Sequence, residues 1–362
     1  MQVVLDQKHI LGIMSGTSCD GLDLCLASFS KTTSGFNYNI HQHHFFPYSK
    51  TWIQKLKTAR QQTGEQVKIL ESEFTDLQID CIKQFEKLYL DNQIDIISTH
   101  GHTVFHQPAL GFTFQMTFGN RIAQKTNKIC VSNFRDQDVF LGGQGAPLVP
   151  IGDLHLFSDY EVCLNLGGFA NVSFNACFQD TNKRLAFDVC PFNILLNTII
   201  ADLGLDYDNN GALASEGKID EFLLNELNQL AYYQKDAPKS LSVEDLDIYY
   251  KLLNKNSSSI KTKLCTFVEH FAEQIAQILE DKSTVLITGG GAYHQFFIHR
   301  LKAKTNCKIE IPKPELIEFK EALIFGFLGF LRLHNQPNVL SSVTGSKQDH
   351  SSGDVHYPAQ NL

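Results

Sequence analysis

The chain has no run of basic residues and no apolar segment long enough to cross a membrane. Its 31 Lys and Arg against 39 Asp and Glu give a formal net charge of -8. Neither nucleic acid nor a membrane is therefore expected as a partner. Residues 1–6 lack the basic start, the long apolar core and the cleavage site of a secretion signal. These absences favour a cytoplasmic location.

A disulfide framework is also absent. The nine cysteines are scattered, with no C-x-x-C pair and no repeated spacing, so we expect reduced, mostly buried thiols. The remaining composition is ordinary for a soluble globular protein. A chain of 362 residues can form two domains with sizeable cores.

Small residues are concentrated in one segment near the start of the chain, Gly12–Asp23. Apolar residues precede and follow it, which predicts a strand, a tight turn and a second strand. Glycines allow backbone N–H groups to approach an anion closely, and the carboxylates of Asp20 and Asp23 suit Mg²⁺ beside a phosphate. The segment therefore suits a nucleoside triphosphate, although it lacks the Lys of the G-x-x-x-x-G-K-[ST] loop. The alternative is an ordinary hairpin turn rich in small residues.

Two later segments follow the same logic. Val162–Phe174 again predicts strand, glycine turn and strand, and in Val285–Ala292 a strand ends in three glycines before a predicted helix over Tyr293–Leu301. Such a junction places backbone donors and a helix N-terminus at a ligand. The spacing is not G-x-G-x-x-G, which disfavours a dinucleotide site. Two similar hairpins about one domain length apart indicate a duplicated architecture with a nucleotide between the halves.

Hydrophobic periodicity predicts the other elements. A helical stretch over Trp52–Leu90 is broken near Thr63-Gly64, and an apolar strand covers Ile94–Ser98. Further helices are predicted over Asn193–Leu203, Ile219–Tyr233, Ile260–Leu279 and Phe319–Leu333. The glycine- and proline-rich run Gly142–Pro150 suits a crossing between two domains.

A series of short motifs in a fixed order gives the chain a specific resemblance. The motifs are Gly12–Asp23, His100–Pro108, Asn133–Val139, Gly142–Pro150, Asn165–Asn171, Ala186–Asp188, Thr288–Ala292 and Ser342–Gly345. Together they resemble those of 1,6-anhydro-N-acetylmuramic acid kinases, which belong to the superfamily of sugar kinases, heat-shock 70 ATPases and actin. The resemblance runs through nearly the whole chain.

The resemblance implies an α/β fold of two ribonuclease-H-like domains, each a five-stranded mixed sheet with helices, with an ATP cleft between them. The N-terminal domain would span residues 1–140 and the C-terminal domain residues 141–334, with the tail 335–362 returning to the first. The implied reaction couples attack of water at C1 of the anhydro-sugar to phosphorylation of O6. It gives N-acetylmuramic acid 6-phosphate and ADP in peptidoglycan recycling, and a homodimer is implied as the assembly.

ATP and Mg²⁺ are the cofactors that the resemblance implies. Asp20 would hold Mg²⁺ or its water shell, or else cap the turn. The implied nucleotide-binding residues are Gly16, Thr17, Ser18, Cys19, Asp20, Gly21, Leu22, Asp23, Gly167, Gly168, Asn171, Gly289, Gly290 and Gly291.

Asp188 matches the family's catalytic base, which activates the attacking water much as the base of an inverting glycosidase does. From the residues alone it can also be the N-cap of the helix predicted from Pro191 to Leu203. The family continues from this Asp as D-T-G-P-G-N, whereas this chain carries Val189, Cys190 and Phe192. We expect the added bulk to reshape the pocket, alter the substrate or weaken activity.

The implied sugar-binding residues are His100, His102, Arg135, Asp138 and Glu321. The first two, with His106, also have the spacing of a zinc site, but recognition of sugar hydroxyls from a loop after a strand is the better reading. The family usually has Gln where His102 stands. Arg135 either forks onto the lactyl carboxylate of the sugar or pairs with a neighbouring Asp, and Glu321 either reaches the sugar or is a solvated acid near a helix start.

Two other functions stay open. The altered segment after Asp188, together with His102, fits a kinase of the same fold for another sugar. A non-catalytic regulator that binds ATP or sugar is the second, although the presence of both Asp20 and Asp188 argues against it. Lys239-Ser240 matches part of a family loop whose T-G-R-E continuation is missing here, so this loop has no assigned role.

Overall fold

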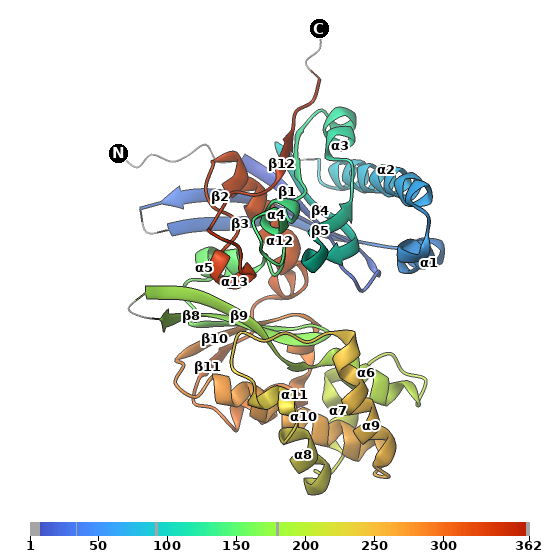
Figure 1. Cartoon of the computed structure of the whole chain (residues 1–362), viewed down its shortest axis with the longest axis vertical. Helices are drawn as coiled ribbons and strands as arrows, with labels where there is room; N and C mark the ends of the chain where they lie inside the picture. Colours follow the sequence, from blue (N-terminus) through green and yellow to red (C-terminus); the bar gives the residue numbers. More distant parts are fainter. Residues whose placement is uncertain (1–7, 34, 91–92, 179–180, 360–362) are drawn as a thin grey trace. The chain divides into compact units, whose positions relative to one another are not determined.

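The computed structural model describes residues 8–33, 35–90, 93–178 and 181–359 (Figure 1). The chain divides into two compact units: residues up to 156 together with those from 319 on, and residues 157–318. The sequence placed the boundaries after residues 140 and 334. In the structure, residues 141–156 and 319–334 belong to the first unit.

The first unit is built on a seven-stranded mixed sheet of order β12-β6-β4-β1-β2-β3, with β5 paired to β4. Its strands are β1 (Lys8–Ser15), β2 (Gly21–Thr32), β3 (Gly35–Pro47), β4 (Ile96–Gln107), β5 (Phe112–Met116), β6 (Ile129–Ser132) and β12 (Asp354–His356). β1, β2 and β3 are antiparallel neighbours, whereas β4 runs parallel to both β1 and β6. Because β5 and β12 extend it, the predicted count of five strands is wrong for this unit.

Seven α-helices are described in the first unit. They are α1 (Lys50–Thr58), α2 (Gly64–Leu88), α3 (Gly119–Thr126), α4 (Asp136–Phe140), α5 (Pro150–Leu156), α12 (Pro314–Leu333, from residue 319 on) and α13 (Ser341–Thr344). Of these, α1, α2 and α12 lie where the sequence predicts helix. The break predicted near Thr63 is confirmed, because Thr63 and Gln66 form a capping box that starts α2. Phe74, Ile82 and Phe85 then line the buried face of α2, as the spacing of three and four residues requires.

Packing of α5 against α12 explains why residues 141–156 and 319–334 both belong to the first unit. Gly152 fits against α12 so closely that a Cβ there would lie 2.5 Å from Ile324. The buried pair Asp153 and Lys320 joins the two helices at 2.7 Å. Both helices therefore complete the core of the first unit.

The second unit repeats the same central topology in a five-stranded sheet of order β11-β10-β7-β8-β9. Its strands are β7 (Val162–Leu166), β8 (Phe169–Phe178), β9 (Thr181–Pro191), β10 (Thr284–Thr288) and β11 (Lys308–Glu310). β7, β8 and β9 are antiparallel, and β10 is parallel to β7 and β11. The order β3-β2-β1-β4-β6 of the first sheet is thus reproduced with the same strand directions, which confirms the predicted duplicated α/β fold.

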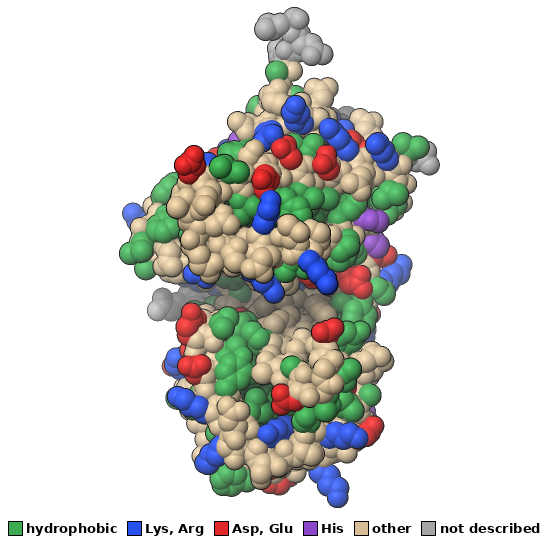
Figure 2. Space-filling model, turned by 90° about the vertical axis from the view of Figure 1, so that its right-hand side faces the viewer, with side chains coloured by type: hydrophobic (Ala, Val, Ile, Leu, Met, Phe, Trp, Pro, Cys, Tyr) green, Lys and Arg blue, Asp and Glu red, His purple; other side chains and the backbone are tan. Residues whose placement is uncertain are grey.

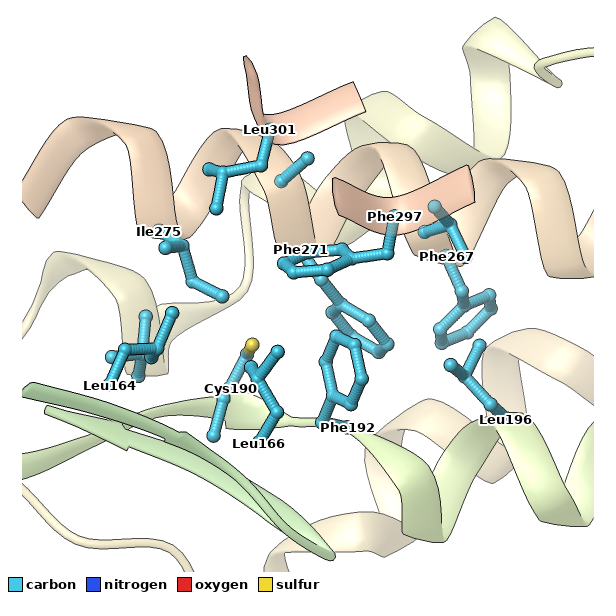
Figure 3. Close-up of a cluster of buried hydrophobic side chains, with 14 of the residues drawn as sticks. Leu164, Leu166, Cys190, Phe192, Leu196, Phe267, Phe271, Ile275, Phe297 and Leu301 are labelled. Atoms are coloured by element: carbon cyan, nitrogen blue, oxygen red, sulfur yellow. The ribbon is translucent and has the colours of Figure 1, made fainter. Parts of the chain in front are cut away.

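Helices and a large aromatic cluster complete the second unit. Its helices are α6 (Asn193–Ala201), α7 (Ala212–Ser215), α8 (Glu221–Asn228), α9 (Asp247–Lys255), α10 (Ile260–Ile278) and α11 (Gln295–Lys302). Figure 3 shows Phe192 packed with Phe271 of α10 and Phe297 of α11, at ring-centroid distances of 5.4 and 4.8 Å. All three side chains are fully buried, so they fix α6 against these helices.

The surface and the cysteines agree with the composition. Basic and acidic side chains are interspersed on the face drawn in Figure 2. The cysteines are free thiols, and all except Cys177 are buried. Across the described residues, none of the helices has the length and apolarity needed to span a membrane.

Candidate active site

The first glycine turn, Gly16–Asp20, joins β1 to β2 and exposes its polar side chains. Thr17, Ser18 and Asp20 are exposed, and the Ser18 hydroxyl donates to Asp20 Oδ1 at 2.6 Å. Cys19 takes a left-handed backbone with φ 56, and its N–H donates to Gly16 O at 3.2 Å. The turn therefore presents hydroxyls, a carboxylate and small residues together at one sheet edge, as a phosphate and its metal require.

A buried polar network lies directly beneath this turn. The Ser15 hydroxyl hydrogen-bonds to Tyr48 Oη at 2.7 Å and to His102 Nδ1 at 2.9 Å. His102 Nε2 lies 4.0 Å from Cys19 Sγ. Burial lowers the pKa of His102 to about 4, so the ring is neutral near pH 7. With both ring nitrogens engaged inside the protein, His102 supports the turn rather than offering a free nitrogen to a sugar.

The histidine motif lies on a strand, not on the loop that the sequence suggested. β4 continues through His100, His102 and His106 to Gln107, because β5 pairs with its second half. His106 Nδ1 is hydrogen-bonded to Thr113 Oγ1 at 2.9 Å. No group of three metal-ligating side chains occurs in the described part of the chain, and the partners of His100 and His102 leave them unsuited to zinc.

Arg135 and His100 form a second buried network in the first unit. Arg135 Nε donates to His100 Nε2 at 2.8 Å, and its Nη1 donates to Gly145 O at 2.7 Å. His100 Nδ1 in turn donates to Gly101 O at 3.0 Å. Burial and the Arg135 cation lower the pKa of His100 well below its usual range. Thus His100, for which the resemblance implies sugar binding, orients Arg135, and in the described part of the chain Arg135 bonds His100 and Gly145 O rather than a neighbouring Asp.

Asp138 is likewise an internal residue. It is fully buried, and its Oδ2 accepts from Gly145 N at 2.6 Å while its Oδ1 accepts from Thr344 Oγ1 at 2.7 Å. The carboxylate therefore joins the loop of Gly145 to the C-terminal segment. In this arrangement it is occupied by the protein and not presented to a sugar.

Glu321 and Arg135 are the predicted sugar-site residues that keep donor or acceptor capacity. The Glu321 side chain is exposed on α12, and it interacts electrostatically with Arg135 and Lys320. Among the described residues, Arg135 Nη2 has no hydrogen-bond partner after its Nε and Nη1 are used. A carboxylate acceptor and a cationic donor therefore remain for a polar, anionic ligand.

The second glycine turn, Gly167-Gly168, is held by backbone contacts with the start of α6. Gly168 O accepts from the N–H groups of Phe192 and Ile194 at 2.7 and 3.2 Å, and Gly167 O accepts from Asn193 N at 3.2 Å. The Asn193 side chain donates to Leu166 O at 3.1 Å. The turn carbonyls thus face the helix.

The third glycine cluster packs beside the second turn, because β10 is parallel to β7. A Cβ at Gly289 would lie 2.7 Å from Asn165 Oδ1, and one at Gly291 would lie 2.5 Å from the Phe192 ring. At Gly290 only Asn193 Nδ2, 3.9 Å away, comes near. Gly290 is therefore the exposed member of the cluster, with room above its backbone for a ligand.

Asp188 lies on β9 opposite Asn171 of β8, near the end of this edge strand. Its Oδ2 accepts from Leu241 N at 2.9 Å. Burial raises the pKa of Asp188, and this N–H partly opposes the rise. α6 begins at Asn193 with Phe192 as N-cap and no side-chain cap, so Asp188 is not the cap of that helix. A half-buried carboxylate of raised pKa is instead suited to taking a proton.

The three departures from the family motif are core residues. Val189, Cys190 and Phe192 are at most 3% exposed, and Figure 3 shows Cys190 and Phe192 directed into the hydrophobic cluster. Burial also raises the pKa of the Cys190 thiol well above its usual range, which excludes a thiolate nucleophile at neutral pH. Their bulk therefore packs into the core, and its effect on substrate or activity stays a prediction.

The other residues predicted to bind the nucleotide differ in how far they are buried. Cys19, Gly21 and Leu22 are buried and can offer only backbone to a ligand, and Leu22 belongs to the hydrophobic core. Asp23 lies on β2, half-buried. Thr17, Ser18, Asp20, Gly168 and Gly290 are exposed.

Four residues that support the site had no role predicted from the sequence: Ser15, Tyr48, Tyr232 and Leu241. Ser15 directly precedes the first turn, and this position in the motif is a sequence signal for contact with the turn. Tyr48 and Tyr232 reach the site through tertiary contacts over 33 and 44 residues, and Leu241 acts through its backbone. Residue type gives no signal for such roles.

The repeated sheet, with a glycine turn after the first strand of each unit, is the ribonuclease-H-like architecture predicted from the sequence. Comparison with known proteins specifies the family. Residues 8–358 match the family model described as anhydro-N-acetylmuramic acid kinase. The chain belongs to this family.

Curated relatives agree over their whole length. The chain is 32% identical to the anhydro-N-acetylmuramic acid kinase of Haemophilus influenzae, with 96% of this chain and 97% of the relative covered. It is 33% identical to that of Pasteurella multocida, covering 97% of each, and 31% identical to that of Vibrio cholerae, covering 98% and 99%.

Proposed function

We propose that this protein is an ATP-dependent kinase that opens the 1,6-anhydro ring of 1,6-anhydro-N-acetylmuramic acid with water and phosphorylates O6. Family membership supports the substrate class, and the observation that carries the mechanism is the environment of Asp188. This half-buried carboxylate has one oxygen bound by Leu241 N and a raised pKa. Those properties fit a general base.

The reaction balances with one base. A water loses a proton to Asp188 and its oxygen bonds to C1, while the bond from C1 to O6 breaks. O6 then bonds to the γ-phosphorus of ATP, and ADP leaves. The proton passes from Asp188 to solvent, so the products are N-acetylmuramic acid 6-phosphate and ADP.

Nucleotide binding is assigned to the three glycine segments. Backbone N–H groups and hydroxyls of Gly16–Ser18 would contact the phosphates, as would the Gly167-Gly168 turn with Asn171, and Gly290 would lie against the adenosine. The exposed oxygen donors of Asp20 fit Mg²⁺, whose preferred ligands are oxygens. When bound, Mg²⁺ neutralises phosphate charge.

Sugar binding is assigned to Arg135 and Glu321. The guanidinium suits the lactyl carboxylate, and the Glu321 carboxylate suits sugar hydroxyls. His100 and Asp138 act behind them by holding Arg135 and the Gly145 loop. We further propose a cytoplasmic homodimer that serves peptidoglycan recycling.

The first experiment measures ADP release from Mg-ATP with and without 1,6-anhydro-N-acetylmuramic acid, with mass spectrometry of the sugar. We expect sugar-dependent ADP and a product that has gained one water and one phosphate. ADP release without that mass gain would point to another sugar.

The matching variant is Asp188→Asn. Turnover should fall at least about a hundredfold, while ATP binding and the folded state stay near those of the wild type. Turnover near the wild-type rate would remove Asp188 from the mechanism.

A further inference from the structure

The free edge of β9 is covered at Asp188 by one segment, residues 232–241. β9 pairs with β8 on its other side. On the free side, Asp188 N donates to Lys239 O at 3.0 Å, and Leu241 N donates to Asp188 Oδ2 at 2.9 Å. The Tyr232 hydroxyl donates to Asp188 O at 2.6 Å. The segment therefore contacts the N–H, the carbonyl and the carboxylate of this single residue.

The segment is also stabilised by contacts within itself and with α9. The Lys239 ammonium lies 4.9 Å from the centre of the Tyr232 ring and donates to Tyr232 O at 3.3 Å and Lys235 O at 3.1 Å. The next tyrosine, Tyr233, hydrogen-bonds through its hydroxyl to Tyr249 Oη at 2.7 Å. These contacts preform the segment, so its hold on Asp188 does not depend on a bound ligand.

We propose that residues 232–241 are a positioning clasp for the catalytic base: the Tyr232 hydroxyl fixes the Asp188 backbone, and the Leu241 amide occupies Oδ2, which leaves Oδ1 as the oxygen that takes the proton from water. This inference rests on the proposed function of Asp188. Among the described residues, Oδ2 accepts a hydrogen bond and Oδ1 accepts none. A fixed carboxylate with one open oxygen holds a water in one orientation, which is the geometric requirement for a general base.

The Leu241 amide also acts on the charge of the base. Its hydrogen bond favours the ionised carboxylate and opposes the effect of burial on the Asp188 pKa. Two titratable groups interact with Asp188: Cys190 on β9 and Tyr232 on the clasp. Burial raises the pKa of both, so they stay neutral, and Lys239 is engaged by carbonyls of the clasp. Removing the amide donor should therefore raise the pKa of Asp188.

The first test compares a tyrosine of the clasp with one outside it. Tyr232→Phe removes only the hydroxyl that reaches Asp188, and we expect kcat to fall about fivefold or more with the KM for ATP unchanged. Tyr250→Phe changes a half-buried tyrosine of α9 that lies outside the clasp, and it should leave kcat near the wild-type value. Equal effects of the two variants would overturn the clasp.

The second test deletes the donor. Leu241→Pro removes the amide hydrogen, so the acid limb of the pH profile of kcat should move to higher pH. Leu241→Ala keeps the amide hydrogen, so its acid limb should stay at the wild-type pH. A limb that stays in place in a folded Leu241→Pro protein would overturn the proposal. Asp188→Asn separates the two hypotheses. Near-normal turnover in that variant defeats the proposed function itself. If Asp188→Asn loses turnover but the acid limb of Leu241→Pro stays at the wild-type pH, only the clasp is defeated.

Discussion

The corresponding turns of the two units, Gly16–Asp20 after β1 and Gly167-Gly168 after β7, occupy the same place in sheets of the same order but are held differently. Side chains hold the first: Ser15 bridges Tyr48 and His102, and His102 reaches Cys19. The second is held mainly by backbone, through three N–H groups at the start of α6, with one side-chain bond from Asn193 to Leu166 O.

The difference shows how one topology can be supported by two kinds of interaction. Under the first turn, a polar network can be altered one group at a time. Behind the second turn, the position of α6 is set by Phe192 in the hydrophobic core. Substitutions under the first turn should therefore change nucleotide affinity first, and those behind the second should change folding first.

The largest effect is expected from Phe192→Ala. Removing this fully buried ring leaves a cavity beside Phe271 and Phe297, and such changes cost about 3–5 kcal/mol. Urea unfolding measures the loss. Phe222→Ala, at a ring that is 66% exposed, is the control and should cost less than about 0.5 kcal/mol. A loss below about 1 kcal/mol for Phe192→Ala would mean that α6 is held in another way.

His102→Ala tests the side-chain support of the first turn. Loss of the ring frees Cys19 and Ser15, and we expect the KM for ATP to rise about tenfold, or ~1.4 kcal/mol, with the KM for the sugar little changed. His102→Gln keeps a donor and an acceptor and should recover most of the affinity. If the sugar KM rises instead, His102 belongs to the sugar site.

The repeated sheet could be predicted because the hairpins carry local signals. Apolar runs on both sides of small residues indicate strand, turn and strand wherever they occur, and α2 was marked by the break near Thr63-Gly64 and by its spacing. The two additional strands of the first sheet were not predictable in this way. β12 has three residues and exists because β6 offers an edge, which is a tertiary cause.

The sequence motifs single out residues of the candidate site but do not predict the contacts that these residues make. Asp188 and the glycine turns were proposed from their motifs, and their roles stay predictions. His100, His102 and Asp138 were expected at the sugar, yet the structure buries them in networks that only the pairing of β4 with β1 and the return of Thr344 create. Likewise, the direction of Cys190 and Phe192 depends on the core behind them, which the sequence of the motif does not reveal.

Gly290→Val tests the predicted adenosine contact beside the second turn. A side chain there has open space within the protein but occupies room assigned to adenosine, so we expect the KM for ATP to rise about fivefold, or ~1 kcal/mol, with the sugar KM unchanged. Stability should stay within about 0.5 kcal/mol. Gly291→Ala is the matched contrast, since its Cβ would strike the Phe192 ring and lower stability by about 1–3 kcal/mol. Equal rises of both KM values for Gly290→Val would argue against an adenosine role.

The smallest expected effect concerns the stability of the Asp188→Asn variant. Burial raises the pKa of Asp188, so the folded protein keeps this proton to higher pH than the unfolded chain does. The ionised carboxylate therefore destabilises the fold increasingly as pH rises from its ordinary pKa through the raised one, and fully above it. An amide has no such penalty.

The variant should accordingly be more stable than the wild type at pH 7–8, by up to about 0.5 kcal/mol, and the gap should close toward pH 4. Urea unfolding at both pH values checks the sign, with the exposed Asp206→Asn as control. A variant less stable by more than about 1 kcal/mol at pH 7 would mean that the bond from Leu241 outweighs burial. In that case the carboxylate is a structural group. If the Asp188→Asn variant is instead more stable and has lost turnover, Asp188 is a catalytic base whose ionised form destabilises the fold.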